Sequence, residues 1–239
     1  MAQLIRAPSD PRHEAAALQM WRQVAWILAL GTIAIVALMI GVDAAAIGWM
    51  PPRGTPSLWP VRILTDFGKD AYVLWTLAGL LLTIALAVPL SRAGARQRLL
   101  RLGIDVQYLF VAVSVPLVAA TIIKWTVGRG RPFVGGKADA FNFAPFNGAE
   151  AHFSLPSAHV VTAFALAFGV AAIWPRTRVI MAVYAVLIAM TRLVLLAHHP
   201  SDVVAGAVLG VLGALMARYW FAARRLGFAI DPKGEIAPL

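Results

Sequence analysis

Six long runs of apolar residues, separated by short polar segments, constrain this chain more than any other feature of its sequence. A helix needs roughly 20 apolar residues to cross the hydrocarbon core of a bilayer. Only 13% of the 239 residues are charged, against about a quarter in a soluble domain. The runs predict membrane-spanning helices at about 23–42, 71–90, 106–123, 160–175, 179–197 and 203–217.

The fold class that follows is an all-α polytopic membrane protein, with a single domain over residues 1–239 and six transmembrane helices. The last three runs are short, so we expect residues of the flanking motifs to complete those helices. In the last run, Gly206 and Gly210 have the spacing of a close helix contact. We expect the first run to stay as a helix, because it is longer than the roughly 7–15 apolar residues of a cleaved signal peptide.

Basic residues predict the orientation of the chain. Six crossings put both terminal segments and the loops 91–105 and 174–178 on one side, and that side carries most of the 21 lysines and arginines. The more positive side of a membrane protein is cytoplasmic. We therefore expect both termini to lie in the cytoplasm and the protein to lie in the inner (plasma) membrane. The basic residues on the cytoplasmic side, which orient the chain, account for much of the net charge of +10. A nucleic acid is therefore not an expected partner.

Polar residues from four separate segments fall at the outer face in this topology. Ionisable groups at membrane depth are costly and usually functional. Singly, Lys124 and Arg131 could be snorkelling anchors, His159 an interfacial histidine and Asp202 a carboxylate at a helix start. Arg192 is harder to explain in this way, because it interrupts an apolar run. Together the residues predict an anion site that faces the periplasm or the exterior. The residues are Lys124, Arg131, Ser157, Ala158, His159, Arg192, His198 and Asp202.

The cationic members suit a phosphoryl group. Lys124, Arg131 and Arg192 supply fixed positive charges for a transition state that spreads negative charge over three oxygens. Ser157 adds a hydroxyl donor, and the amides near Ala158, at the start of a helix, add main-chain donors.

The histidines suit covalent catalysis. His198 and Asp202 are four residues apart, so Asp202 can accept the Nδ1–H of His198 if a helix starts at Pro200. Nε2 is then free to attack phosphorus. His159 comes from a different helix and could protonate the leaving oxygen.

Three motifs carry a resemblance: Lys124-x6-Arg131-Pro132, Pro156-Ser157-Ala158-His159 and Thr191-Arg192-x5-His198-x3-Asp202. They resemble the signature of the type 2 phosphatidic acid phosphatase superfamily. The resemblance implies a phosphohistidine on His198 oriented by Asp202, with His159 as general acid and then base. It also implies that Lys124, Arg131, Arg192 and Ser157 hold the phosphate and that no metal or cofactor is required. Ala158 and Thr191 depart from the usual glycine and serine.

The function that we expect is metal-independent hydrolysis of a lipid phosphomonoester or diphosphate. Phosphatidic acid, phosphatidylglycerol phosphate, undecaprenyl diphosphate and a lipid A phosphate all stay open, as does the oligomeric state. Transfer of the phosphoryl group to a lipid hydroxyl would use the same residues. An anion transporter would predict matched Gly/Pro interruptions in two repeats, which the sequence does not show. For the segment 65–70 we expect a helix start capped by Thr65 or Asp66, and the alternative is that it reaches the site from the first outer loop.

Overall fold

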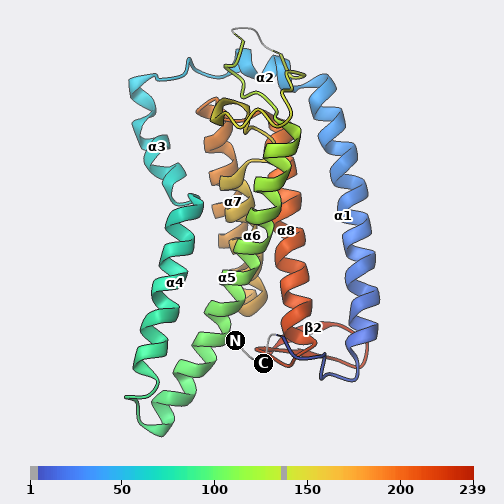
Figure 1. The fold of residues 1–239 in the computed structure, drawn as a ribbon, viewed down its shortest axis with the longest axis vertical. Coiled ribbons are helices and arrows are strands. Elements are labelled where there is room, and N and C mark those ends of the chain that lie inside the picture. The colour runs from blue at the N-terminus through green and yellow to red at the C-terminus, as the bar shows by residue number, and fades with distance from the viewer. Residues whose placement is uncertain (1–4, 136–138) are drawn as a thin grey trace.

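A computed structural model describes residues 5–135 and 139–239 as a bundle of long helices (Figure 1). The helices are α1 (His13–Gly41), α2 (Asp43–Trp49), α3 (Trp59–Asp66), α4 (Asp70–Ala87), α5 (Ala93–Val127), α6 (Ala158–Ile173), α7 (Arg178–Val194) and α8 (Pro200–Ala222). Short 3-10 turns lie at Pro56–Leu58, Glu150–His152 and Pro175–Thr177.

Each predicted apolar run overlaps one of the helices α1, α4, α5, α6, α7 and α8. Among the described residues, five helical segments are long and apolar enough to cross a membrane. The sixth, α6, has 16 residues and measures only about 24 Å, short of a core of about 30 Å. The count of six crossings therefore stays a prediction. As expected, motif residues begin two of the three short helices, α6 at Ala158 and α8 at Pro200, whereas α7 is not extended at its end.

Two features differ from the predicted fold. Helix α7 ends at Val194 instead of continuing to Ala197, and Leu196 adopts a positive φ of 48° as the chain turns towards α8. The chain is also not purely helical, because β1 (Phe228–Ile230) and β2 (Ile236–Pro238) form a small antiparallel sheet after α8. Phe228 packs its ring edge-on against Tyr108 of α5 at 4.9 Å. Strands of three residues leave too short an alternation to be recognised in the sequence.

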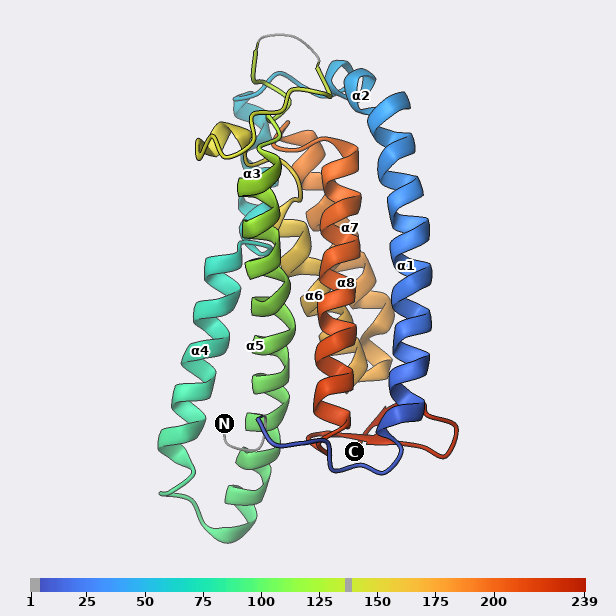
Figure 2. The same cartoon turned by 45° about the vertical axis from the view of Figure 1, so that its right-hand side comes forward.

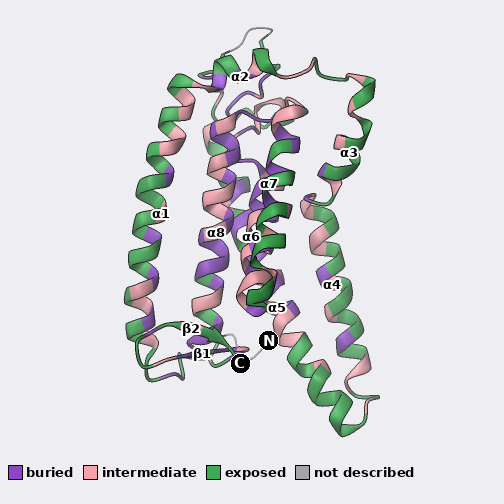
Figure 3. Ribbon diagram, turned by 180° about the vertical axis from the view of Figure 1, so that it is seen from behind, coloured by how far each residue is buried: buried purple, intermediate pink, exposed green. Residues whose placement is uncertain are grey.

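Helix α8 forms the centre of the bundle and packs against α1, α5 and α6 (Figure 2). Buried residues concentrate along α8 and α6, whereas α1 and α4 are mostly exposed (Figure 3). The exposed faces are themselves apolar, with Trp26 and Leu30 on α1 and Leu82 on α4. Large apolar surfaces of this kind are suited to lipid rather than water.

Close approach of α6 and α8 depends on the two glycines singled out in the sequence. A Cβ atom on Gly206 would lie 2.7 Å from the carbonyl oxygen of Ser157, and one on Gly210 would lie 2.5 Å from that of Val161. Because the obstacle is main chain, it cannot rotate away. The predicted close helix contact is confirmed, and it fixes the start of α6 against the start of α8.

We expect Gly210→Ala to lower the stability of the folded protein by about 1–3 kcal/mol, the usual cost of overpacking. Gly79→Ala in α4 is the matched control, because nothing lies within 4 Å of its added Cβ and alanine favours a helix by about 1 kcal/mol over glycine. Thermal unfolding in detergent measures both. Equal melting temperatures for the two variants would contradict the proposed tight contact.

Candidate active site

The predicted site residues gather at the end of the bundle opposite the two termini, below α2 and the loop that joins α5 to α6 (Figure 1). Lys124 lies in the last turn of α5, Arg192 in the last turn of α7, and Asp202 in the first turn of α8. Ser157 precedes α6 as its N-cap, and its main-chain N–H donates to the carbonyl oxygen of Asp202 at 3.1 Å. Helix ends and their connections thus bring three separate motifs together.

His198 lies in the connection between α7 and α8, almost fully buried. Its Nδ1 lies 2.8 Å from the carbonyl oxygen of Ser154 and 3.9 Å from Oδ2 of Asp202. The expectation that Asp202 accepts this proton is therefore wrong in its detail, because a main-chain carbonyl accepts it. A carbonyl oxygen only accepts, so Nδ1 carries the proton and the lone pair of Nε2 stays available.

Burial lowers the pKa of His198 well below its ordinary value, and the neighbouring cations lower it further against the opposing effect of Asp202. The imidazole is therefore neutral at neutral pH. A neutral ring with its proton on Nδ1 is the form that a nucleophilic histidine requires.

Asp202 is completely buried and binds several donors at once. Its Oδ2 accepts the Ser154 hydroxyl at 2.6 Å and the main-chain N–H of His199 at 2.9 Å, and it lies 3.1 Å from Nδ1 of His199. With His199 it forms a capping box at the start of α8. Asp202 acts on His198 through Ser154, whose hydroxyl it holds and whose carbonyl oxygen faces the His198 ring.

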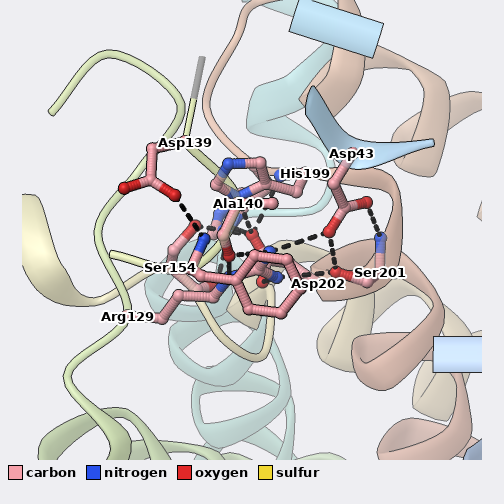
Figure 4. A network of polar contacts seen from close by, with 10 residues as sticks. Asp43, Arg129, Asp139, Ala140, Ser154, His199, Ser201 and Asp202 are labelled. Atoms are coloured by element: carbon pink, nitrogen blue, oxygen red, sulfur yellow. Dashed lines mark hydrogen bonds and ion pairs between the residues drawn. The ribbon is translucent and has the colours of Figure 1, made fainter. Parts of the chain in front are cut away.

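Arg129 is the largest fully buried side chain in the described structure, and the sequence analysis did not single it out. Its guanidinium donates to Oδ1 of Asp202 at 2.7 Å and to Oδ2 of Asp43 at 2.8 Å. It also donates to the Ser201 hydroxyl at 2.6 Å and to the carbonyl oxygen of Ala140 at 2.7 Å. Figure 4 shows these side chains in one network, which ties α2, the α5–α6 loop and α8 together.

Asp43 completes this network from the first residue of α2. Its carboxylate accepts the main-chain N–H of Ser201 at 3.0 Å and the Ser201 hydroxyl as well as Arg129. A carboxylate directly after an apolar run was a usable signal, because an ionisable group at that depth needs a partner. The sequence does not say which cation provides it.

Gly128 shapes the loop that carries Arg129. Gly128 has φ +58°, and a Cβ atom there would lie 1.9 Å from the carbonyl oxygen of Ala144. The Arg129 main chain forms an isolated bridge with Phe143, and its carbonyl oxygen accepts the N–H of Ser154 at 3.0 Å. Only glycine fits at the end of α5, and the resulting turn sends Arg129 inward.

Three buried donors around His198 have no hydrogen-bond partner within the described part of the chain: the Ser157 hydroxyl, Nε of Arg131 and Nε of Arg192. Unsatisfied buried donors are rare in folded proteins and need an explanation. The charges of Arg131 and Arg192 also act on Lys124 and on His159, so these groups share one electrostatic environment. The arrangement can surround an anion of several oxygens with donors from the α5–α6 loop, the start of α6 and the end of α7.

The segment around Thr65 reaches this site, which corrects the expected helix start. Thr65 and Asp66 end α3, while α4 starts at Asp70 with Lys69 as its N-cap. The Thr65 hydroxyl accepts from Arg192 at 2.8 Å and from the Thr191 hydroxyl at 3.0 Å. Threonine at position 191, where the family usually has serine, thus keeps a bonded hydroxyl that supports Arg192.

Ala158 is the first residue of α6, so its amide lies at the positive end of the helix dipole. Over residues 5–135 and 139–239, no three His, Cys, Asp or Glu side chains are grouped so that they could hold a metal ion. The donor set around His198 is cationic and hydroxylic instead, and its chemistry is that of an oxyanion site.

Comparison with known proteins gives concordant results. A lipid A 1-phosphatase of Rhizobium johnstonii is 34% identical over 174 residues, which cover 72% of this chain and 71% of that protein. Another, of Rhizobium etli, is 36% identical over 127 residues, covering 53% and 55%. An Escherichia coli protein provisionally named undecaprenyl-diphosphatase YbjG is 33% identical over 118 residues, covering 46% and 56%. No solved structure matches.

The family model that matches is the PAP2 superfamily, over residues 106–226, and this range contains all three motifs and every predicted site residue. With just over half of the chain inside the family model, this protein belongs to the PAP2 superfamily, the type 2 phosphatidic acid phosphatases.

Proposed function

We propose that this protein hydrolyses a lipid phosphomonoester or diphosphate at the outer face of the inner (plasma) membrane, without a metal, through a phosphohistidine on His198. Membership of the family and the named relatives make it a phosphatase that acts on a lipid phosphate. The observation that carries the mechanism is the Nδ1 contact of His198 with the Ser154 carbonyl oxygen, which leaves Nε2 as the free nucleophile.

In the first step, Nε2 of His198 attacks phosphorus and the bond from phosphorus to the lipid oxygen breaks. With the anionic phosphate bound among these cations, His159 is protonated and gives its proton to that oxygen, so the lipid leaves as an alcohol or, from a diphosphate, as a monophosphate. Lys124, Arg131 and Arg192 neutralise the oxygens of the transferred group, and the Ser157 hydroxyl donates to one of them.

In the second step, neutral His159 takes a proton from water, and the water oxygen attacks the phosphohistidine. The bond from phosphorus to Nε2 breaks, inorganic phosphate leaves, and His159 is protonated again. The protons and bonds of His198 and His159 are restored at the end of the cycle, and the net reaction consumes one water and needs no oxidant.

A lipid substrate is supported by an apolar groove beside the site. The groove has a volume of about 490 Å³ and is lined by Ile63 and Phe67 around α3, Tyr72 and Leu77 of α4 and Leu166 of α6. It lies on the bundle surface and adjoins Gly68, where an added Cβ would be 3.4 Å from the carbonyl oxygen of His159. A hydrocarbon chain in this groove would keep its phosphorylated end near His159. The relatives' names put a lipid A 1-phosphate and undecaprenyl diphosphate first among the candidates.

The test is phosphate release by purified protein with excess chelator, from a panel of lipid monophosphates and diphosphates, in water enriched in oxygen-18. We expect chelator-resistant release, with one heavy oxygen in each phosphate, because water resolves the intermediate. A phosphorylated lipid without heavy oxygen would instead identify transfer to a lipid hydroxyl. Release abolished by chelator and restored by a divalent cation would refute the metal-independent mechanism.

A further inference from the structure

A cationic cavity adjoins the proposed phosphate site and shares Arg131 and Arg192 with it. It has a volume of about 290 Å³ and is lined by four arginines, Arg53, Arg62, Arg131 and Arg192, with Ala197 next to His198. Such a volume corresponds to about ten water molecules at roughly 30 Å³ each. The sequence motifs include only Arg131 and Arg192, whereas Arg53 and Arg62 come from the segment between α2 and the end of α3.

The positive charge of this cavity is only partly compensated, because Asp66 acts on Arg192 and Asp202 acts on Arg131 from outside its lining. No acidic residue is among the described residues that line it. The carboxylate paired with Arg131 is that of Glu150, at 3.3 Å with an 86% exposed side chain, and a pair so exposed contributes little. Four guanidinium groups around one cavity repel one another unless an anion lies between them.

Two of these arginines also have unused donors. Nε of Arg131 and Nε of Arg192 are buried without a hydrogen-bond partner among residues 5–135 and 139–239. Arg192 is only 8% exposed, and Thr65 holds one of its terminal nitrogens. Arg53 is positioned in turn by Phe133, because its guanidinium lies 3.7 Å from the centre of that ring. Arg53, Arg131 and Arg192 thus each have a contact that positions the side chain, whereas the side chain of Arg62 is exposed beside them.

We propose that this cavity binds the second phosphoryl group of a lipid diphosphate, with Arg53 and Arg62 as residues that determine specificity. The inference rests on the proposed function. The terminal phosphoryl group is held beside His198, and the inner one lies between Arg53 and Arg62. When the bond from the terminal phosphorus to the bridging oxygen breaks, the lipid monophosphate that leaves gains negative charge, and these two arginines stabilise it.

The position of α3 fits a diphosphate attached to a hydrocarbon chain. Arg62 lines the cationic cavity, and its neighbour Ile63 lines the apolar groove. One short helix therefore separates an anion site from a surface for hydrocarbon. A substrate with two linked phosphoryl groups and a long chain presents charge and hydrocarbon in the same order.

The test compares a lipid diphosphate with the monophosphate of the same lipid, at low ionic strength, in Arg53→Met, Arg62→Met and the double variant. We expect kcat/KM for the diphosphate to fall by about tenfold in each single variant, as for the loss of a hydrogen bond to a charged group. The kcat/KM for the monophosphate should change by less than about twofold. Lys69→Met is the matched control: it removes an outer-face cation, whose ammonium lies over the Tyr72 ring and outside the cavity, and should affect both substrates alike.

A second readout does not depend on catalysis. Titration of the purified protein with pyrophosphate and with orthophosphate, followed by the shift in melting temperature, should show tighter binding of pyrophosphate, and the double variant should lose that difference. Equal losses for both lipid substrates, or a pyrophosphate preference that survives in the double variant, would overturn the proposal. If neither lipid is hydrolysed but the pyrophosphate preference depends on Arg53 and Arg62, the anion site stands and the proposed function fails.

Discussion

Replacing His198 with alanine should reduce phosphate release by at least about 10⁴-fold, because loss of a covalent nucleophile removes the whole pathway and not one contact. The His198 side chain is the last member of the chain of contacts that runs from Arg129 through Asp202 and Ser154, and it bonds to neither Arg129 nor Asp43, so the variant should fold and still bind phosphate. Brief reaction with a phosphorus-32-labelled lipid followed by quenching in alkali, in which phosphohistidine survives, should trap labelled wild-type protein and no labelled variant.

Two histidine controls make this result specific. His13→Ala changes a histidine at the opposite end of the bundle, where Nδ1 contacts the carbonyl oxygen of Asp10 at 2.7 Å, and should leave the rate unchanged. His199 adjoins the proposed nucleophile, but its Nδ1 faces Asp202. If His198→Ala kept the label and a folded His199→Ala lost it, the assignment of the nucleophile would be wrong.

What the sequence predicted well depended on spacing along helices. The order and alternating direction of the long apolar runs predicted that Lys124, Ser157, Arg192 and Asp202 lie near helix ends on one side, and the structure places them at helix ends in one part of the bundle. Gly206 and Gly210 likewise predicted a helix contact through their spacing alone. Periodicity and chain connectivity are local properties, so they can be read without knowledge of the packing.

The features of the site that the sequence analysis did not predict depend on main-chain groups or on partners that are distant in the sequence. The carbonyl oxygen of Ser154, which takes the place expected for Asp202 beside His198, carries no signature in the residue type. Arg129 meets Asp43 across 86 residues, and nothing local distinguishes it from Arg131, two residues later. Packing decides which of two neighbouring arginines faces inward, and the turn at Gly128 makes that choice only in the folded chain.

Arg129→Met should destabilise the protein by about 3–5 kcal/mol, because it leaves two buried carboxylates without their counter-charge. For a chain of this size the melting temperature should fall by on the order of 10 °C. At a temperature where the variant is still folded, its activity per folded molecule should also be lower than that of the wild type. The reason is that Arg129 holds Asp202, Asp202 holds the Ser154 hydroxyl, and the Ser154 carbonyl oxygen orients His198.

A double-mutant cycle separates this network from a general loss of positive charge. Asp43→Asn removes one of the two carboxylates that Arg129 neutralises, so the double variant with Arg129→Met should lose clearly less stability than the two single losses together. Arg98→Met, an exposed arginine in α5, should change stability by less than about 0.5 kcal/mol. Additive losses for Arg129→Met and Asp43→Asn would mean that the two side chains act independently. The connection between α2 and the start of α8 would then depend on the hydrogen bond from the main-chain N–H of Ser201 to Asp43.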